Sequence, residues 1–139
     1  MKIEYLTELD VRFNTNADKG RRWQLIAPFV FTVDGERFTV PAGFWTDFAS
    51  IPRALWRIIS PYDIGKGPVP HDFGYYTGLK GKAFWDSVLL ACMEYEDVAG
   101  WKHQPVYQAV NWFGGWTWDN YRKQGGTAAQ LTRLERRSL

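Results

Sequence analysis

Three side chains capable of acid–base chemistry fall close together in the middle of this sequence. His71 and Asp72 begin the stretch HDFGYY, and Tyr75 follows four residues after the histidine. On a helix, residues four apart lie on the same face, so His71 and Tyr75 would point the same way. An imidazole held in a cleft in this manner is suited to move a proton near neutral pH. The stretch therefore predicts a candidate general base at His71.

A further ionisable residue, Asp86, stands on an apolar helix face. Apolar side chains occupy the positions three, four and seven residues after it, namely Leu89, Leu90 and Met93. Burying an unpaired carboxylate costs several kcal/mol, so Asp86 needs a partner, and His71 and Arg53 are the natural candidates. If the partner is His71, the carboxylate would fix the tautomer of the ring and raise its basicity, as in many hydrolases.

Asp47 is the third acidic candidate. It follows a turn that contains glycine, in PAGFWTD. Its carboxylate could cap the helix that follows, pair with Arg53, or join Asp72 in binding a hard divalent cation through oxygen atoms. Capping and ion pairing are commoner than metal binding, and the sequence leaves all three roles open.

The same residues also have a purely structural interpretation. A His-Asp dipeptide often arises by chance, and a lone buried histidine is more often a hydrogen-bonded core residue than a catalyst. The tyrosine one turn later and the isolated Asp86 bring the two interpretations to about equal weight. With two histidines and a single cysteine, Cys92, the sequence does not predict a closed zinc site, and Cys92 is expected in the core.

The elements that must position these residues form one domain of the α+β class. The chain has 139 residues, the size of an ordinary single domain, and contains no repeats or linker-like segments. An antiparallel β-meander is predicted at about residues 5–42, a helical part at about 50–120, and a short amphipathic C-terminal helix at about 127–137. The helices are expected to pack on the meander as a small bundle.

Turn residues and periodicity set the boundaries within these parts. Residues 22–40 predict two strands joined at Asp34-Gly35, a dipeptide suited to positive φ angles. A short helix is predicted from Ser50 and a second one from about Pro70 to Gly78. A third helix is predicted at 82–98, closed by Gly100, and a fourth begins at Pro105 and is interrupted at Gly114-Gly115. Gly74, between His71 and Tyr75, is expected to leave room for another backbone.

Composition and charge restrict the partners. The formal net charge is only +2, so no strong field draws the molecule to nucleic acid or to an anionic membrane. No apolar run is long enough to span a membrane, and the N-terminus lacks a signal-peptide pattern, so we expect synthesis in a cytoplasm. Aromatic residues make up 17% of the chain, which suggests that some face a groove or a partner. The basic residues from Arg122 onward could contact an acidic surface, but a solvated basic helix end is the favoured interpretation.

Four stretches together resemble a family of small uncharacterised proteins from tailed phages and prophages. They are VPAGFWTDFASIPRALW, HDFGYY, AFWDSVLLACMEYEDV and YQAVNWFGG, and the match covers about residues 23–118. The family is a domain of unknown function, so the resemblance implies phage origin and supplies no activity. On this basis we expect a protein that is made in the host cytoplasm and then joins the virion, with other phage structural proteins or copies of itself as partners.

A second likeness concerns a His-Asp-x-x-Tyr motif followed by an aspartate on the next helix. This pattern, here His71, Asp72, Tyr75 and Asp86, is similar to that of secreted and parvoviral calcium-dependent phospholipases. The likeness implies that the histidine activates water, the adjacent aspartate binds calcium, and the tyrosine and the distant aspartate hold the histidine. The glycine-rich calcium loop and the disulfides of those enzymes have no recognisable counterpart, and only the segment that ends in Asp47 could substitute for the loop.

Two functions of different classes follow from these observations. The leading hypothesis is a phage structural or assembly protein of the tail or connector region, in which Asp47–Arg53 and His71–Asp86 are buried polar contacts. The alternative is a metal-assisted hydrolase of ester, lipid or cell-wall substrates, with His71 as general base and Asp86 as its orienter. In that alternative, Asp72 and Asp47 would bind calcium or another divalent cation.

Overall fold

The computed structural model describes residues 1–13, 23–46 and 61–123. In these ranges antiparallel strands occupy the N-terminal part and helices the C-terminal part, which confirms the predicted α+β class. The helix predicted from Ser50 and the C-terminal helix predicted at 127–137 lie outside the described residues.

The strands of the described ranges form two three-stranded antiparallel sheets, with the orders β1-β4-β5 and β2-β3-β6. Their bounds are Ile3–Tyr5 for β1, Val11–Phe13 for β2, Trp23–Leu25 for β3, Phe29–Val33 for β4, Glu36–Val40 for β5 and Trp45–Thr46 for β6. β1 pairs with β4, and β2 pairs with β3. The single meander predicted at about 5–42 is therefore divided between two sheets.

The hairpin of β4 and β5 follows the prediction from its turn residues. Asp34 and Gly35 have φ angles of +49° and +83°, the two positive values that a type I′ turn requires. Phe31 and Phe38 lie opposite each other across the hairpin, with ring centroids 5.5 Å apart. The prediction of one long strand before the turn is wrong, because the strand is interrupted at Pro28. Proline has no N–H to donate to a β-ladder. The residues before Pro28 form β3 of the other sheet.

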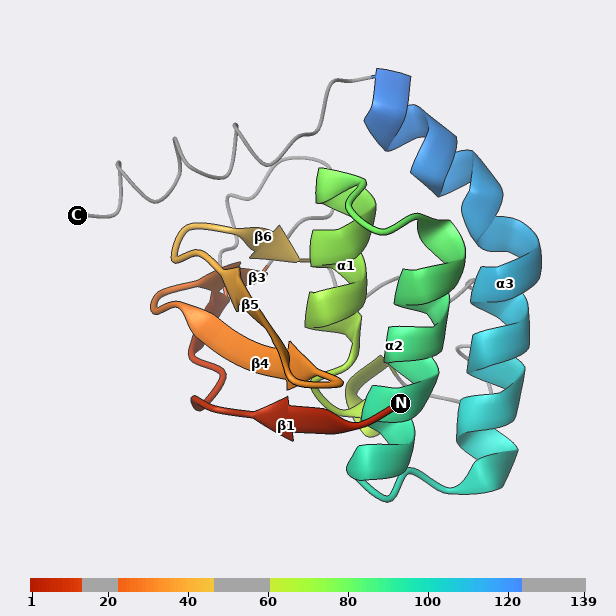
Figure 1. Cartoon of the computed structure of the whole chain (residues 1–139), viewed down its shortest axis with the longest axis horizontal. Coiled ribbons are helices and arrows are strands. Elements are labelled where there is room, and N and C mark those ends of the chain that lie inside the picture. Colours follow the sequence, from red (N-terminus) through yellow and green to blue (C-terminus); the bar gives the residue numbers. More distant parts are fainter. Residues whose placement is uncertain (14–22, 47–60, 124–139) are drawn as a thin grey trace.

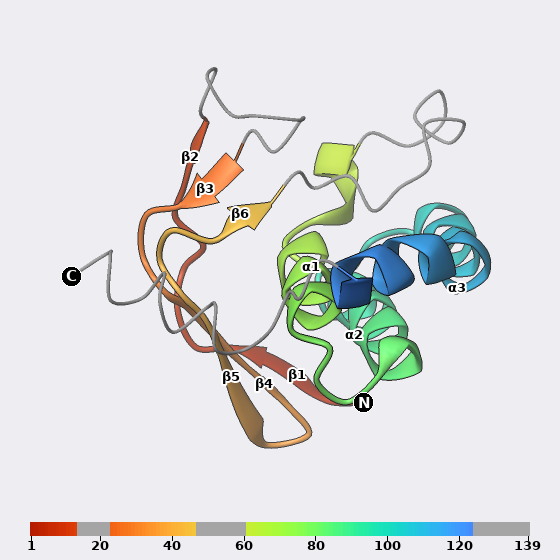
Figure 2. The same ribbon diagram turned by 90° about the horizontal axis from the view of Figure 1, so that it is seen from above.

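Three helices follow in the described ranges, after a short 3-10 helix at Pro61–Ile64: α1 at Pro68–Thr77, α2 at Lys82–Tyr95 and α3 at Gly100–Lys123. α1 has proline in its first turn and ends at Gly78, whose φ is +71°, so it agrees closely with the prediction. α1 and α2 lie beside the strands, and α3 lies on the far side of these two helices (Figures 1 and 2). None of the described helices is long and apolar enough to cross a membrane.

α3 departs most from the prediction. Gly100 was expected to close α2, and Pro105 to open the next helix, but α3 begins at Gly100 and includes Pro105 in its second turn. α3 also continues through Gly114-Gly115, where an interruption was expected. The glycines do not break the helix because Gly114 packs closely against Tyr75 of α1, and such tertiary contacts routinely override low helix propensity.

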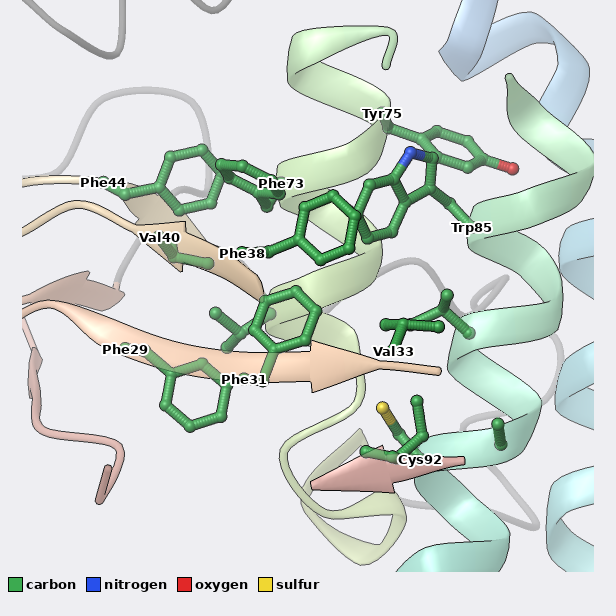
Figure 3. Close-up of a cluster of buried hydrophobic side chains, with 14 of the residues drawn as sticks. Phe29, Phe31, Val33, Phe38, Val40, Phe44, Phe73, Tyr75, Trp85 and Cys92 are labelled. Carbon is green, nitrogen blue, oxygen red and sulfur yellow. The ribbon is translucent and has the colours of Figure 1, made fainter. Parts of the chain in front are cut away.

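An aromatic core joins the first sheet to α1 and α2 (Figure 3). The fully buried Trp85 of α2 lies at its centre, and its ring meets those of Phe31, Phe38 and Phe73 at centroid distances of 6.5, 5.2 and 5.8 Å. A Cβ atom on Gly74 would overlap the Trp85 ring. The space at Gly74 is thus filled by an indole ring and not by the backbone that the sequence led us to expect. This core fixes the spacing between α1 and α2, and so the distance between the residues that they carry.

Candidate functional site

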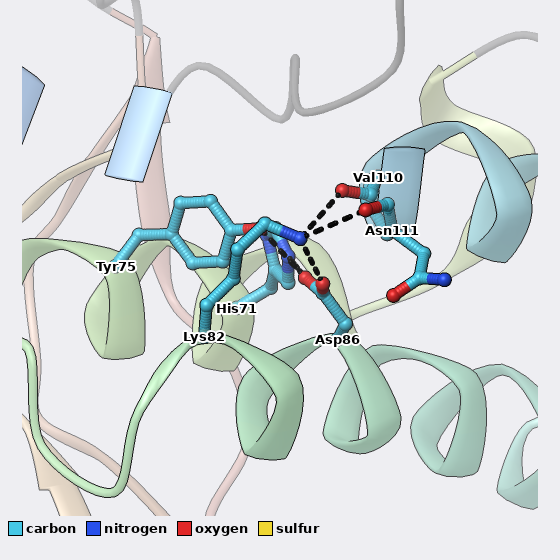
Figure 4. A network of polar contacts seen from close by, with 6 residues as sticks. All are labelled: His71, Tyr75, Lys82, Asp86, Val110 and Asn111. Atoms are coloured by element: carbon cyan, nitrogen blue, oxygen red, sulfur yellow. Dashed lines mark hydrogen bonds and ion pairs between the residues drawn. The ribbon is translucent and has the colours of Figure 1, made fainter. Parts of the chain in front are cut away.

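His71, Tyr75 and Asp86 meet in the interior of the molecule (Figure 4). His71 and Tyr75 lie one turn apart on α1, and Asp86 faces them from α2. The Nε2 atom of His71 is 2.9 Å from Oδ1 of Asp86, and the Tyr75 hydroxyl donates a hydrogen bond of 2.6 Å to the same oxygen. His71 and Asp86 are each only 1% exposed. The expected contact between the histidine and the acid of the following helix is therefore present, and it is buried.

Lys82 completes this network, although the sequence reasoning did not identify it. Its Nζ atom lies 2.6 Å from Oδ2 of Asp86, one turn along α2, and donates hydrogen bonds of 3.1 Å to the carbonyl oxygens of Val110 and Asn111 on α3. All three ammonium protons can thus find acceptors. The Lys82–Asp86 pair has the i, i+4 spacing that favours an ion pair on a helix, and this spacing was the available signal.

Burial and hydrogen bonding set the protonation states of the network. Burial lowers the pKa of His71 and outweighs the nearby Asp86, which acts to raise it. Burial also acts to raise the pKa of Asp86, but the hydrogen bonds donated to its two oxygens hold it below its usual value. Near pH 7 the imidazole is therefore neutral and the carboxylate is ionised. Because a carboxylate only accepts hydrogen bonds, the His71 proton is on Nε2 and the basic lone pair is on Nδ1.

Tyr75 serves as a fixed hydrogen-bond donor. Burial and the neighbouring Asp86 raise the pKa of Tyr75, so its hydroxyl stays protonated across the physiological range. Gly114 of α3 leaves the space that this hydroxyl fills, since a Cβ atom there would overlap the oxygen. The Tyr75 ring also meets Trp118 edge to face, with centroids 5.3 Å apart. Two residues of α3 thus hold the tyrosine against the acid.

Arg122 ties the end of α3 to the end of α1. Its Nη2 atom donates hydrogen bonds of 2.7 Å to the carbonyl oxygens of Tyr75 and Tyr76, and its guanidinium group lies 4.8 Å from the centre of the Trp118 ring. A cation at the C-terminal end of a helix stabilises the last carbonyl groups. The expectation of a solvated basic helix end is therefore wrong at Arg122, which fixes the turn of α1 that carries Tyr75.

Asp72 lies next to the network but bonds to a different element. Its Oδ2 atom accepts a hydrogen bond of 2.6 Å from Oγ1 of Thr46 at the end of β6. The next residue in the sequence, Asp47, lies outside the described residues, as does Arg53. In the described part of the chain, no group of three or more His, Cys, Asp or Glu side chains is placed to hold a metal ion. Calcium takes about six to eight oxygen ligands, so these residues alone do not fit a calcium site.

Cys92 is a core residue, as expected from the sequence. It is fully buried on α2, and burial raises the pKa of its thiol to about 12. The thiolate needed for nucleophilic attack is therefore scarce at neutral pH. Any chemistry in this region rests on the histidine and the acids.

The network has the arrangement of a general base and its orienter. The Asp86 carboxylate fixes the His71 ring and would stabilise the imidazolium formed when Nδ1 takes up a proton. The same contacts also link α1, α2 and α3, because His71, Asp86 and Lys82 come from two helices and bond to the third. A buried polar network of this kind specifies helix packing.

Comparisons with known proteins place the chain in a family. A relative from Sinorhizobium fredii (strain NBRC 101917 / NGR234), described as "Uncharacterized protein y4jT", is 33% identical over 109 residues. The match covers 73% of this chain and 32% of the relative, so the chain spans about a third of that protein's length. No solved structure matches the chain at a significant level. Residues 23–110, which include His71, Asp72 and Asp86, match the family described as "Protein of unknown function (DUF1353)", and the chain therefore belongs to the DUF1353 family.

Proposed function

We propose that this protein is a hydrolase in which His71 is the general base and Asp86 its orienter. The observation that carries the proposal is that one oxygen of Asp86 accepts hydrogen bonds from both the His71 ring and the Tyr75 hydroxyl. These are the partners that the phospholipase likeness implies for residues in this pattern. Their contact fixes the tautomer and orientation of the imidazole before any substrate binds.

The proposed reaction is the hydrolysis of an ester by water. The His71 ring takes a proton from water as the water oxygen bonds to the ester carbonyl carbon. The carbon–oxygen bond to the alcohol then breaks, and the imidazolium returns its proton to the departing alkoxide. Asp86 remains ionised throughout and stabilises the transient imidazolium. Lys82 and Tyr75 hold the carboxylate by hydrogen bonds of 2.6 Å each.

A divalent cation is a separate part of the proposal. The phospholipase likeness implies Asp72, the carboxylate next to His71, as one ligand, although its Oδ2 atom also accepts a hydrogen bond of 2.6 Å from Thr46. Asp47 is the second ligand that the sequence predicts. Chelation with EDTA is expected to abolish hydrolysis, and added calcium is expected to restore it. In the Asp72→Asn variant, added calcium is expected to have no effect on the rate of hydrolysis. Hydrolysis that persists in EDTA would show that no divalent cation is needed, and the proposed role of His71 would still stand.

The test compares wild-type protein with His71→Asn and with the matched control His103→Asn. His103 is the other histidine of the chain, half-buried near the start of α3 and outside the network. Phospholipid vesicles, a water-soluble ester and peptidoglycan are the substrates. We expect His71→Asn to lose roughly 10²- to 10⁴-fold in rate, and His103→Asn to keep the wild-type rate. Wild-type protein inactive on all three substrates would overturn the proposal, and so would a folded His71→Asn with full activity.

A phage structural or assembly protein is the second proposal. Two observations favour it: the near-complete burial of His71, which suits a structural contact, and four exposed aromatic residues on α3, namely Trp101, Trp112, Phe113 and Trp116. On this proposal the partners are other phage structural proteins or copies of the chain, and the protein resides in the virion. Mass spectrometry of purified virions from a prophage that encodes the chain tests it. Consistent absence from the particles would refute a virion location.

A further inference from the structure

We propose that a second copy of this chain binds to the outer face of α3. Four large aromatic side chains define this surface, which we call the α3 aromatic face: Trp101, Trp112, Phe113 and Trp116. They are 61%, 71%, 68% and 76% exposed, respectively. Tryptophan and phenylalanine are buried on average and are enriched in the centres of protein interfaces. The proposal does not depend on whether His71 is catalytic.

Three of these residues form a narrow stripe along the helix. At about 100° per residue, Trp112 and Trp116 lie roughly 20° and 60° around the helix axis from Trp101. Trp101 and Trp116 are separated by about 22 Å along the axis. Because α3 lies on the far side of α1 and α2 from the strands (Figures 1 and 2), a stripe on its outer side is accessible to another molecule.

The polar residues around the stripe point to a protein partner. The other exposed side chains of α3 that lie between the aromatics are the amides Gln104, Gln108 and Asn111. Asp119 and Lys123 are the exposed charged side chains of this helix, and their charges cancel. Lys102 is half-buried, with its Nζ atom 5.1 Å from the centre of the Trp101 ring and 3.6 Å from Asp63, whose charge offsets it. Nucleic acid and anionic membranes attract clustered basic residues, and the described residues of this face form no such cluster. An aromatic surface depleted of charge is typical of the centre of a protein interface.

The exposed area is sufficient for a symmetric pair. An aromatic side chain buries about 150–250 Å², so covering four at these exposures would remove roughly 400–700 Å² from water on each copy. A pair that used this face on both copies would bury roughly 800–1,400 Å² in total, and the upper part of this span reaches the range of stable interfaces. As an exposed apolar patch on a monomer, roughly 400–700 Å² lies in the upper part of the usual range or above it.

The stripe is self-complementary when two α3 helices run antiparallel. A two-fold axis close to Gln108 places Trp101 opposite the partner's Trp116. The same axis places Trp112 opposite the partner's Pro105, and the two Gln108 side chains meet at the centre. Large apolar side chains thus face apolar partners at both ends, and the two Gln108 amides face each other at the centre. A two-fold interface of this kind closes on itself, so it gives a dimer and no larger assembly.

Sedimentation equilibrium of the full chain tests the proposal. The wild type is expected to form a dimer. The double variant Trp112→Gln/Trp116→Gln is expected to have a dimer dissociation constant at least about 100-fold higher, because central aromatic residues dominate binding. Ile26→Gln is the matched control, since Ile26 is 53% exposed but lies outside α3. It is expected to leave the dissociation constant within about twofold, and circular dichroism should show all variants folded.

Three results would overturn the proposal. The first is a wild type that stays monomeric at all concentrations up to the millimolar range. The second is a dimer that the double variant does not weaken. The third is a wild-type monomer that binds neutral phosphatidylcholine vesicles through Trp112 and Trp116, which would assign the α3 aromatic face to a lipid surface. A Gln108→Cys variant adds a geometric check: it is expected to form an intermolecular disulfide on oxidation, and a failure to crosslink would reject the antiparallel arrangement.

Discussion

Gly114 of α3 lies directly against the hydroxyl group of Tyr75, where a Cβ atom on the glycine would overlap the oxygen. The same hydroxyl donates a hydrogen bond of 2.6 Å to Asp86. The missing side chain of one residue therefore allows the third helix to close over a network that belongs to the first two. Helix packing and the geometry of the candidate site are coupled at this glycine.

This coupling predicts opposite effects for two neighbouring glycines. Gly114→Ala should lower the free energy of unfolding by about 2 kcal/mol, because Tyr75 or α3 must shift to accept the methyl group. Gly115→Ala is the matched control, since a Cβ atom at Gly115 would meet nothing within 4 Å beyond the adjacent backbone of its own helix. It should raise the free energy of unfolding by up to about 1 kcal/mol through helix propensity alone. Urea unfolding measures both, and equal effects would contradict the close contact at Gly114.

Lys82→Met should destabilise the protein through Asp86. The substitution removes the cation that compensates a carboxylate only 1% exposed, while the Lys82 side chain itself is 22% exposed. Breaking a fully buried ion pair costs about 3–5 kcal/mol. Because Lys82 is partly solvated, we expect a loss of about 2 kcal/mol in the free energy of unfolding.

Lys80→Met is the matched control for Lys82→Met. Lys80 forms an ion pair of 2.7 Å with Glu36, but both side chains are nearly half exposed. Exposed pairs contribute little, so a change within about 0.5 kcal/mol is expected in urea unfolding. If the two lysine variants unfold at the same urea concentration, Lys82 does not compensate the buried charge.

The sequence predicted the contacts that depend on local geometry. His71 and Tyr75 could be placed on one face because helical spacing is regular, and Asp86 needed a partner because an unpaired buried carboxylate is costly. The turn at Asp34-Gly35 was predicted for a similar local reason, the need for positive φ angles. These statements required no knowledge of how distant segments pack.

The features that the sequence did not predict depend on distant segments. Lys82 bonds to carbonyl oxygens of Val110 and Asn111, 28 and 29 residues away. The continuity of α3 through Gly114 depends on Tyr75 of another helix. The division of the strands into two sheets likewise follows from the long-range pairing of β1 with β4. Local propensity does not determine such contacts, because tertiary packing overrides it.

The protonation of His71 gives a pH prediction with a definite sign. Burial lowers its folded-state pKa below the ordinary value of 6.5. As the pH falls below about 6.5, the unfolded chain binds a proton at this residue and the folded protein does not. The free energy of unfolding should therefore decrease as the pH falls from about 6.5 to the folded-state pKa of His71. Above about pH 6.5, His71 should not make the free energy of unfolding depend on pH.

Proton NMR of the imidazole resonances checks this directly. Two histidines contribute signals, and His103→Gln assigns them by removing one set. The remaining His71 resonances are expected to titrate with a midpoint below 6.5. Urea unfolding of the same variant should keep the decrease in stability toward acid pH. A His71 midpoint at or above 6.5 would mean that Asp86 outweighs burial, contrary to the prediction.

Arg122 should stabilise the C-terminal end of α1, although it belongs to α3. Arg122→Met removes two hydrogen bonds of 2.7 Å to the carbonyl oxygens of Tyr75 and Tyr76, and we expect a loss of about 1–2 kcal/mol in the free energy of unfolding. The amide of Gly78, which bonds to the carbonyl of Gly74, should exchange with solvent faster. Lys123→Met is the control, because Lys123 is exposed, and it should change neither quantity. Equal Gly78 exchange rates in the two variants would show that the end of α1 is stable without the arginine.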